Sequence, residues 1–219
     1  IGHVEAGLRT HDKWQPFPEE INRCMISVIA DLNFAPTEHS RENLIHDGVA
    51  DWRICLTGNP VIDALNTIVN QPPPPEALEL LERMGIGKGD KKLILVTAHR
   101  RENFGEPIEN ICKALRALVE SDPEHLRLVY PVHLNPNIQE PVYRMLGDVP
   151  NILLTRPLDY LPLVHIMRNA KIILTDSGGI QEEATALGVP TLVLRRTTER
   201  PEGVEAGTLK LVGTDAEPI

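Results

Sequence analysis

Residues 175–184, which read Thr-Asp-Ser-Gly-Gly-Ile-Gln-Glu-Glu-Ala, combine a glycine turn with carboxylates one helical turn later. The apolar run 171–174 leads into this turn and a helical pattern follows at once, which predicts a strand, a glycine turn and a helix. Gly178 and Gly179 would let backbone N–H groups approach a ligand closely, and the positive end of the helix dipole favours a phosphate. Glu183 is a poor neighbour for phosphate but a good acceptor for two adjacent sugar hydroxyls. The segment therefore predicts a nucleotide site.

The glycine turn alone is weak evidence, because strand-to-glycine turns are common in α/β proteins. Arg200 strengthens the prediction, and so do three further polar clusters that each follow an apolar run, at residues 97–103, 131–135 and 195–200. Ligands bind outside the carboxyl ends of the strands in an open parallel sheet, where these clusters are expected to lie. Their convergence favours a binding site over ordinary surface.

Two histidines in these clusters could move protons, because histidine has an ordinary pKa close to neutrality. A lone histidine in a loop is more often simply solvated. The position of His99 at the end of a strand, beside Arg100 and Arg101, favours function. For His133 both interpretations stay open.

Carboxylates near the start of the chain form another candidate group. Glu5 comes directly after the apolar residues 1–4, and Glu19 and Glu20 follow Pro18. The Pro-Glu-Glu sequence also fits an ordinary helix start, since proline is favoured in the first turn and carboxylates suit the helix dipole. This structural interpretation is the stronger one for Glu20.

Apolar runs and amphipathic segments alternate along most of the chain, which predicts a doubly wound α/β fold with a parallel sheet covered by helices. Strands are predicted at 93–97, 126–132, 151–154, 171–175 and 191–194, and helices at 107–119, 136–145, 160–168 and 179–187. Before residue 57, strands are predicted at 1–4, 32–34 and 53–56, and helices at 19–30 and 38–46. The four prolines at 72–75 predict a stiff, solvated spacer without a helix of its own.

The first 57 residues contain too few elements for an independent core, and the chain begins within a predicted strand without a methionine. We therefore expect a piece of a longer protein. A net charge of −9 argues against a nucleic-acid partner. No apolar stretch approaches the roughly 20 residues of a membrane helix. The three cysteines are far apart and suit reduced thiols, so we expect a cytoplasmic protein with neither a metal nor a cofactor.

Four motifs occur in one order: HVEAGLRT at 3–10, PEEINR at 18–23, TAHRREN at 97–103, and the block at 175–203. In this order they resemble the non-hydrolysing UDP-N-acetylglucosamine 2-epimerases, over residues 1 to about 213. The resemblance implies two Rossmann-like doubly wound domains, as in GT-B glycosyltransferases, with a UDP-sugar between them. Residues 1–57 would be the last part of the N-terminal domain, and residues 58–219 the UDP-binding domain without its final segment.

The activity implied by the resemblance is the interconversion of UDP-GlcNAc and UDP-ManNAc by inversion at C2. UDP would leave from C1 as the C2 proton departs, forming a 2-acetamidoglucal, and would add back after a proton arrives on the opposite face. The family's catalytic residues match Glu5, Glu19 and His99. A homodimer is implied for the full-length protein.

Binding residues are implied as well. The family's diphosphate turn matches Ser177, Gly178 and Gly179, its ribose carboxylate matches Glu183, and a substrate-binding arginine matches Arg200. The loop that faces uracil carries Leu158 and Leu163 where related chains often have a polar and an aromatic residue, so uracil contacts would be mainly backbone or weaker. Arg100 and His133 match residues that bind a second UDP-GlcNAc as an activator.

Three alternatives share the same nucleotide site. A GT-B glycosyltransferase would have the same fold but needs an acceptor pocket, and fold alone does not fix function. A hydrolysing epimerase would release free ManNAc and UDP. A module that binds a UDP-sugar without turnover is the third alternative, and we expect the 219-residue chain itself to be inactive, because much of one domain is missing.

Overall fold

The computed structural model describes residues 1–216 and 219, and these divide into two compact units. The first unit consists of residues 1–63 and 197–202, and the second of residues 64–196 and 203–219. Residues 58–63 and 197–202 are thus grouped by their contacts with the first unit, although they follow the domain boundary predicted at residue 57. The boundary itself stays a prediction.

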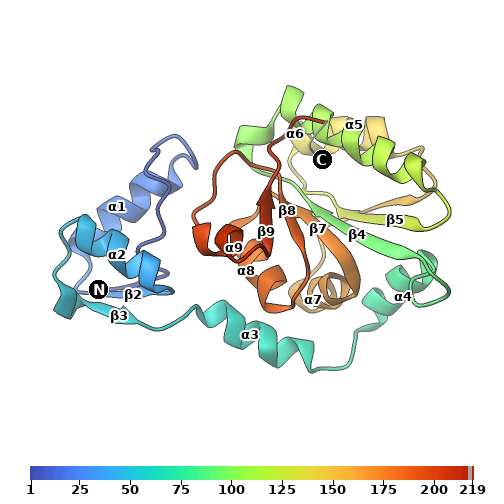
Figure 1. Cartoon of the computed structure of the whole chain (residues 1–219). Helices are drawn as coiled ribbons and strands as arrows, with labels where there is room; N and C mark the ends of the chain where they lie inside the picture. The colour runs from blue at the N-terminus through green and yellow to red at the C-terminus, as the bar shows by residue number, and fades with distance from the viewer. Residues whose placement is uncertain (217–218) are drawn as a thin grey trace. The chain divides into compact units, whose positions relative to one another are not determined.

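The second unit is built on a six-stranded parallel sheet in the order β6-β5-β4-β7-β8-β9 (Figure 1). The strands are β4 (Lys92–Thr97), β5 (Leu126–Pro131), β6 (Ile152–Thr155), β7 (Ala170–Thr175), β8 (Thr191–Val193) and β9 (Leu209–Leu211). β4 and β7 lie side by side in the middle, where both faces are covered, and this is why they read as continuous apolar runs.

Helices cover both faces of this sheet: α4 (Pro75–Arg83), α5 (Glu106–Ser121), α6 (Pro136–Leu146), α7 (Tyr160–Asn169) and α8 (Gly178–Ala186). Alternate residues of β4 point to opposite faces. Ile94 and Val96 pack in one apolar cluster with α5 and α6, whereas Leu93 and Leu95 pack in another with α4, α7 and α8. The doubly wound α/β fold is therefore confirmed.

The first unit contains a three-stranded parallel sheet of β1 (Gly2–Val4), β2 (Leu32–Ala35) and β3 (Ile54–Leu56). Two helices belong to it, α1 (Glu19–Ile29) and α2 (Glu38–His46), with the short 3₁₀ helix η1 (Asp51–Arg53). Its buried apolar cluster is small and is formed by Ala6, Ala35 and Leu44. Several large apolar side chains of α1 are exposed, including Met25, Val28 and Ile29.

Each predicted strand and helix is present within two residues of its predicted bounds. The prediction for the four prolines was wrong in one respect, because Pro75 begins α4 and Pro74 occupies its N-cap. Proline suits the first helical position, where its missing N–H would be unpaired anyway. The sequence reasoning also missed α3 (Pro60–Val69), although both helices start with proline and continue with apolar residues at helical spacing.

Two shorter helices complete the structure, η2 (Arg101–Asn103) after β4 and α9 (Pro201–Glu205) before β9. No helix in the described part of the chain is both long and apolar enough to cross a membrane.

Candidate functional site

In the second unit, two loops meet at the carboxyl ends of the neighbouring strands β4 and β7. Thr97 and Thr175 are paired across the two strands, and their hydroxyl oxygens are 2.6 Å apart. The backbone N–H of Asp176 donates to the carbonyl of Thr97 at 3.1 Å. The sheet therefore places the loop of His99 against the turn that holds Ser177.

Asp176 joins these two loops through its side chain, which is fully buried. Its Oδ2 accepts hydrogen bonds from the backbone N–H groups of His99 and Arg100 and from Nδ2 of Asn103, each at 2.8 Å. The guanidinium Nε of Arg100 donates to the backbone carbonyl of Asp176 at 2.9 Å. Sequence reasoning missed Asp176 and Asn103, although both belong to the quoted motifs.

His99 lies between Asp176 and His133. Its Nδ1 is 3.4 Å from Oδ1 of Asp176, and its ring stacks on that of His133 with centroids 5.5 Å apart and planes inclined by 17°. The pKa of His99 is lowered from its ordinary value, mainly by burial. The carboxylate of Asp176 opposes this effect, whereas His133 and Arg100 add to it. At neutral pH His99 is therefore mostly neutral, while 41% of its side chain remains open to solvent.

His133 belongs to the same cluster but lies on the exposed side of it. The backbone N–H of Asn135 donates to Nδ1 of His133 at 3.1 Å, which leaves the ring proton on Nε2 when the histidine is neutral. The structure thus brings His99, Arg100 and His133 together at the ends of β4 and β5.

The glycine turn begins α8 as predicted. Ser177 occupies the N-cap, and its backbone N–H donates to the hydroxyl of Thr175 at 2.9 Å. A Cβ atom added to Gly179 would meet no atom within 4 Å, so packing inside the chain does not require glycine there. The first turn of α8 contains no acidic residue, which suits an anion at the helix N-terminus.

Glu183 lies in α8 and is almost completely buried. The hydroxyl of Tyr160, the first residue of α7, donates to Oε1 of Glu183 at 2.7 Å. Burial raises the pKa of Glu183, and the hydrogen bond from Tyr160 partly opposes this effect. The hydrogen bond from Tyr160 holds the carboxylate in one orientation, with Oε1 occupied and Oε2 on its other side. Sequence reasoning assigned no role to Tyr160.

Leu158 and Leu163, the two residues predicted to lie near uracil, flank the start of α7. Both are partly buried and pack against the apolar cluster that α4, α7 and α8 share. Their contact with a base stays a prediction.

In the first unit, the two predicted catalytic carboxylates are on the surface. Glu5 directly follows β1 with a φ of 58°, and its Oε1 accepts a hydrogen bond from Nδ2 of Asn59 at 2.6 Å. Glu19 is the first residue of α1 and is exposed. A non-glycine residue with a positive φ is uncommon, which makes Glu5 a notable position.

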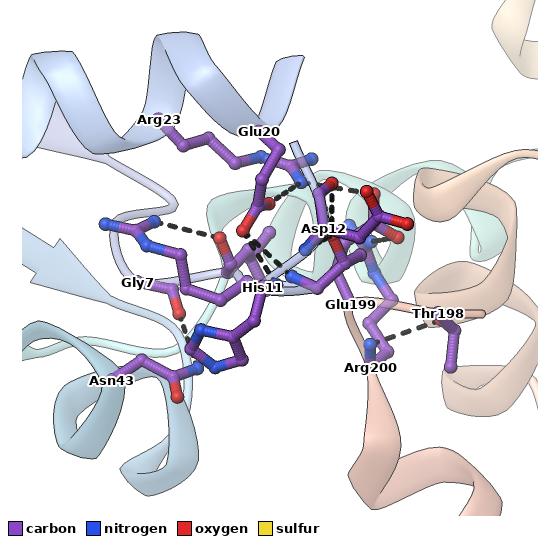
Figure 2. A network of polar contacts seen from close by, with 12 residues as sticks. Gly7, His11, Asp12, Glu20, Arg23, Asn43, Thr198, Glu199 and Arg200 are labelled. Carbon is purple, nitrogen blue, oxygen red and sulfur yellow. Dashed lines mark hydrogen bonds and ion pairs between the residues drawn. The ribbon is translucent and has the colours of Figure 1, made fainter. Parts of the chain in front are cut away.

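Glu20, by contrast, is buried and does more than begin a helix. Its Oε1 accepts hydrogen bonds from the backbone N–H groups of Thr10 and His11, at 3.1 and 3.0 Å. Figure 2 shows this carboxylate turned from α1 toward the loop of His11. Glu20 therefore ties the loop after HVEAGLRT to the start of α1, next to Glu19.

Arg200 lies in the segment 197–202, which contacts α1 through a group of charged side chains (Figure 2). Nη1 of Arg23 donates to Oε1 of Glu199 at 3.1 Å, and Nη1 of Arg200 is 3.6 Å from Oε2 of Glu199. Arg23 is also 3.7 Å from Glu20. Because Glu199 is almost completely buried, it needs these cationic partners.

The predicted residues are thus distributed over both units. His99, Arg100, His133, Leu158, Leu163, Ser177, Gly178, Gly179 and Glu183 belong to the second unit, and Glu5, Glu19 and Arg200 belong to the first. Among residues 1–216 and 219, no group of three or more histidine, cysteine, aspartate or glutamate side chains is arranged to hold a metal ion. The arrangement in the second unit offers N–H groups for an anion, a carboxylate for hydroxyls and a histidine for proton transfer.

Comparison with known proteins identifies the family. The model of the family described as UDP-N-acetylglucosamine 2-epimerase matches residues 1–219. The chain belongs to this family. It is 52% identical over 221 residues to the UDP-N-acetylglucosamine 2-epimerase of Salmonella typhimurium, covering 100% of this chain and 58% of that protein.

Solved structures give the same result. The crystal structure of the UDP-GlcNAc 2-epimerase from Neisseria meningitidis bound to UDP-GlcNAc is 46% identical, with a TM-score of 0.93, and the match covers 100% of this chain and 59% of that one. The enzyme from Methanocaldococcus jannaschii in complex with UDP-GlcNAc and UDP is 32% identical, with a TM-score of 0.84 and the same coverage. The chain thus spans less than two thirds of the relatives it matches.

Proposed function

We propose that this chain is the UDP-binding part of an enzyme that interconverts UDP-GlcNAc and UDP-ManNAc. The observation that carries the proposal is the pairing of an open glycine turn at the start of α8 with Glu183, one turn further along the same helix. Ser177, Gly178 and Gly179 would bind the diphosphate, and Glu183 would accept hydrogen bonds from the ribose. The relatives whose structures contain UDP-GlcNAc or UDP support this ligand.

The reaction we propose is inversion at C2 without hydrolysis. The C2 proton is barely acidic, because the N-acetyl group gives no enolate stabilisation, so direct deprotonation is disfavoured. Departure of UDP from C1 together with the C2 proton gives a 2-acetamidoglucal, to which UDP adds back after protonation of the opposite face. Two faces require two proton-transfer groups, and we assign these roles to Glu5 and Glu19.

His99 would lie beside the diphosphate as it departs in this reaction. It lies in the same unit as the glycine turn, on the neighbouring strand end, and its partly exposed ring can reach a ligand. Arg200 would bind the substrate, Leu158 and Leu163 would line the uracil site, and Arg100 with His133 would contact a second UDP-GlcNAc that activates the enzyme. We also propose that the full-length protein is a homodimer in the cytoplasm.

The decisive experiment separates binding from turnover. We expect isothermal titration calorimetry of the 219-residue chain to detect UDP. We expect no epimerisation by this chain, because it spans only 58% of a relative such as the Salmonella typhimurium enzyme and turnover needs every group that orients the sugar and excludes water. The full-length protein should form UDP-ManNAc from UDP-GlcNAc in heavy water with deuterium at C2, followed by NMR.

The alternatives predict other products. Free ManNAc with UDP would indicate a hydrolysing epimerase, a new glycoside would indicate a glycosyltransferase, and binding without turnover in the full-length protein would indicate a binding module. Absence of UDP binding to the 219-residue chain would refute the nucleotide site. Light scattering on the full-length protein tests the homodimer.

A further inference from the structure

Asp176 is a buried carboxylate that is not among the proposed catalytic and binding residues. Burying a charge is costly unless hydrogen bonds and neighbouring charges compensate for it. Here Oδ2 accepts three hydrogen bonds, two from the backbone of the His99 loop and one from Asn103, and all three donors are neutral. This set holds the loop after β4 in a fixed conformation against the turn after β7.

The second oxygen of the same carboxylate has a different environment. No hydrogen bond to Oδ1 of Asp176 is found in the described part of the chain, and this atom is completely buried. Nδ1 of His99 lies 3.4 Å from this oxygen. A buried carboxylate oxygen is a strong acceptor, so the favourable arrangement has a proton on Nδ1 of His99 that faces Asp176.

The position of that proton decides what the other side of the ring can do. In a neutral imidazole one nitrogen donates and the other accepts, and the partner of one nitrogen fixes the state of the other. With Nδ1 protonated toward Asp176, Nε2 of His99 carries the lone pair. When the ring takes up a second proton, that proton resides on Nε2.

We infer that Asp176 is a positioning residue for His99: it fixes the loop, selects the Nδ1–H tautomer and so leaves the lone pair on Nε2 for proton transfer. This inference rests on the proposed function for the role of His99, but the tautomer can be tested without it. The negative charge of Asp176 would also stabilise the imidazolium that forms during proton transfer. Aspartate fulfils this task for histidine in the serine protease triad, where the carboxylate orients the ring and is not itself protonated.

The competing explanation is that Asp176 only holds the two loops together, and Asp176→Asn distinguishes this explanation from positioning of the His99 ring. The amide oxygen of the variant can still accept the three hydrogen bonds, so the loop keeps its conformation. Its NH₂ group would then face Nδ1 of His99 as a donor. The ring must accept there, so its proton moves to Nε2.

The histidine tautomers can be read directly by NMR of the 219-residue chain with ¹⁵N-labelled histidine at pH 8, where the lowered pKa of His99 leaves its ring neutral. We expect Nδ1–H for His99 in the wild type and Nε2–H in Asp176→Asn, with the signal assigned by its loss in His99→Asn. Asp122→Asn is the matched control, because Asp122 makes a 2.6 Å contact with Nδ1 of the partly exposed His125. That variant should change the signal of His125 and leave His99 as it is.

The titration of His99 gives a second readout. The groups that face this ring are Asp176 on the β7 side, His133 on the β5 side and Arg100 on its own loop. Since the carboxylate is the group among them that raises the pKa of His99, Asp176→Asn should lower it, and Asp122→Asn should not. If Asp176 only held the loops together, the substitution would leave the pKa of His99 unchanged.

Kinetics of the full-length protein complete the test. Asp176→Asn should lower kcat by about 10² to 10⁴-fold with little change in KM, the range expected when a proton-transfer group loses its correct tautomer. An Nε2–H tautomer in the wild type would overturn the inference even if the variant failed to fold. So would an unchanged tautomer or normal turnover in the variant. If the wild type makes no UDP-ManNAc, the proposed function fails, while the tautomer result still decides the positioning by Asp176.

Discussion

Replacing Glu183 with alanine tests the ribose assignment most directly, because the structure separates the two oxygens of this carboxylate. Tyr160 donates to Oε1 at 2.7 Å, which leaves Oε2 for a ribose hydroxyl. The ligand offers a matching change, since 2′-deoxy-UDP lacks one of the two hydroxyls. Protein and ligand can therefore be varied together in a cycle that isolates one hydrogen bond.

The expected magnitude follows from the charge and burial of Glu183. A hydrogen bond to a charged group contributes about 1.5 to 3 kcal/mol, which corresponds to roughly 10- to 150-fold in affinity. We expect the wild-type chain to bind UDP more tightly than 2′-deoxy-UDP by a factor in this range. In Glu183→Ala the two ligands should bind almost equally, because the acceptor is gone.

Isothermal titration calorimetry at pH 7 measures both ligands with both proteins. Glu140→Ala is the control, because Glu140 is an exposed glutamate on α6 and should leave both affinities unchanged. The reasoning is refuted if the preference for UDP over 2′-deoxy-UDP is the same in the wild type and in Glu183→Ala. That result would mean that Glu183 contacts another part of the ligand, or none.

Burial raises the pKa of Glu183, so the folded chain holds this proton more tightly than the unfolded chain does. The stability of the fold therefore decreases as pH rises from about 4.5 through the folded pKa. Thermal melts should show Glu183→Gln more stable than the wild type at pH 7 and nearly equal to it below pH 4. In the full-length protein, Glu5→Gln and His99→Asn should each lower kcat by about 10² to 10⁴-fold with little change in KM, and near-normal UDP-ManNAc formation would make that residue structural. Leu115→Ala, in the fully buried face of α5, should lower the free energy of unfolding by about 2 to 5 kcal/mol in urea titrations, whereas a loss below 1 kcal/mol would contradict the packing described for this helix.

The strand, glycine turn and helix around residues 171–187 could be predicted from the sequence because every signal in them is local. An apolar run, two glycines and a helical repeat follow one another without interruption, and the structure places β7 and α8 there. The same holds for the other strands and helices of the second unit, whose apolar periodicity reflects the face that each buries. The start of α4 at Pro75 also had a local signal, which the run of prolines obscured.

Glu19 and Glu20 are an example of a difference that local sequence signals could not predict. They are adjacent and chemically identical, and the sequence favoured a simple helix start for Glu20. In the structure Glu20 is buried and receives two backbone hydrogen bonds from residues nine and ten positions earlier, while Glu19 is exposed. Only the orientation of α1 decides which of the two carboxylates points toward the loop.

The partners of the candidate site residues were likewise decided by the tertiary structure. The sequence alone identified His99 and Glu183, but Asp176 is 77 positions from His99 and Tyr160 is 23 positions from Glu183. The parallel pairing of β4 with β7, and the packing of α7 beside α8 on one face of the sheet, bring these pairs within hydrogen-bonding distance. Residue types and spacing along a chain determine which elements form and which groups follow them. The hydrogen-bond partner of a buried polar group depends instead on which elements become neighbours in the folded sheet.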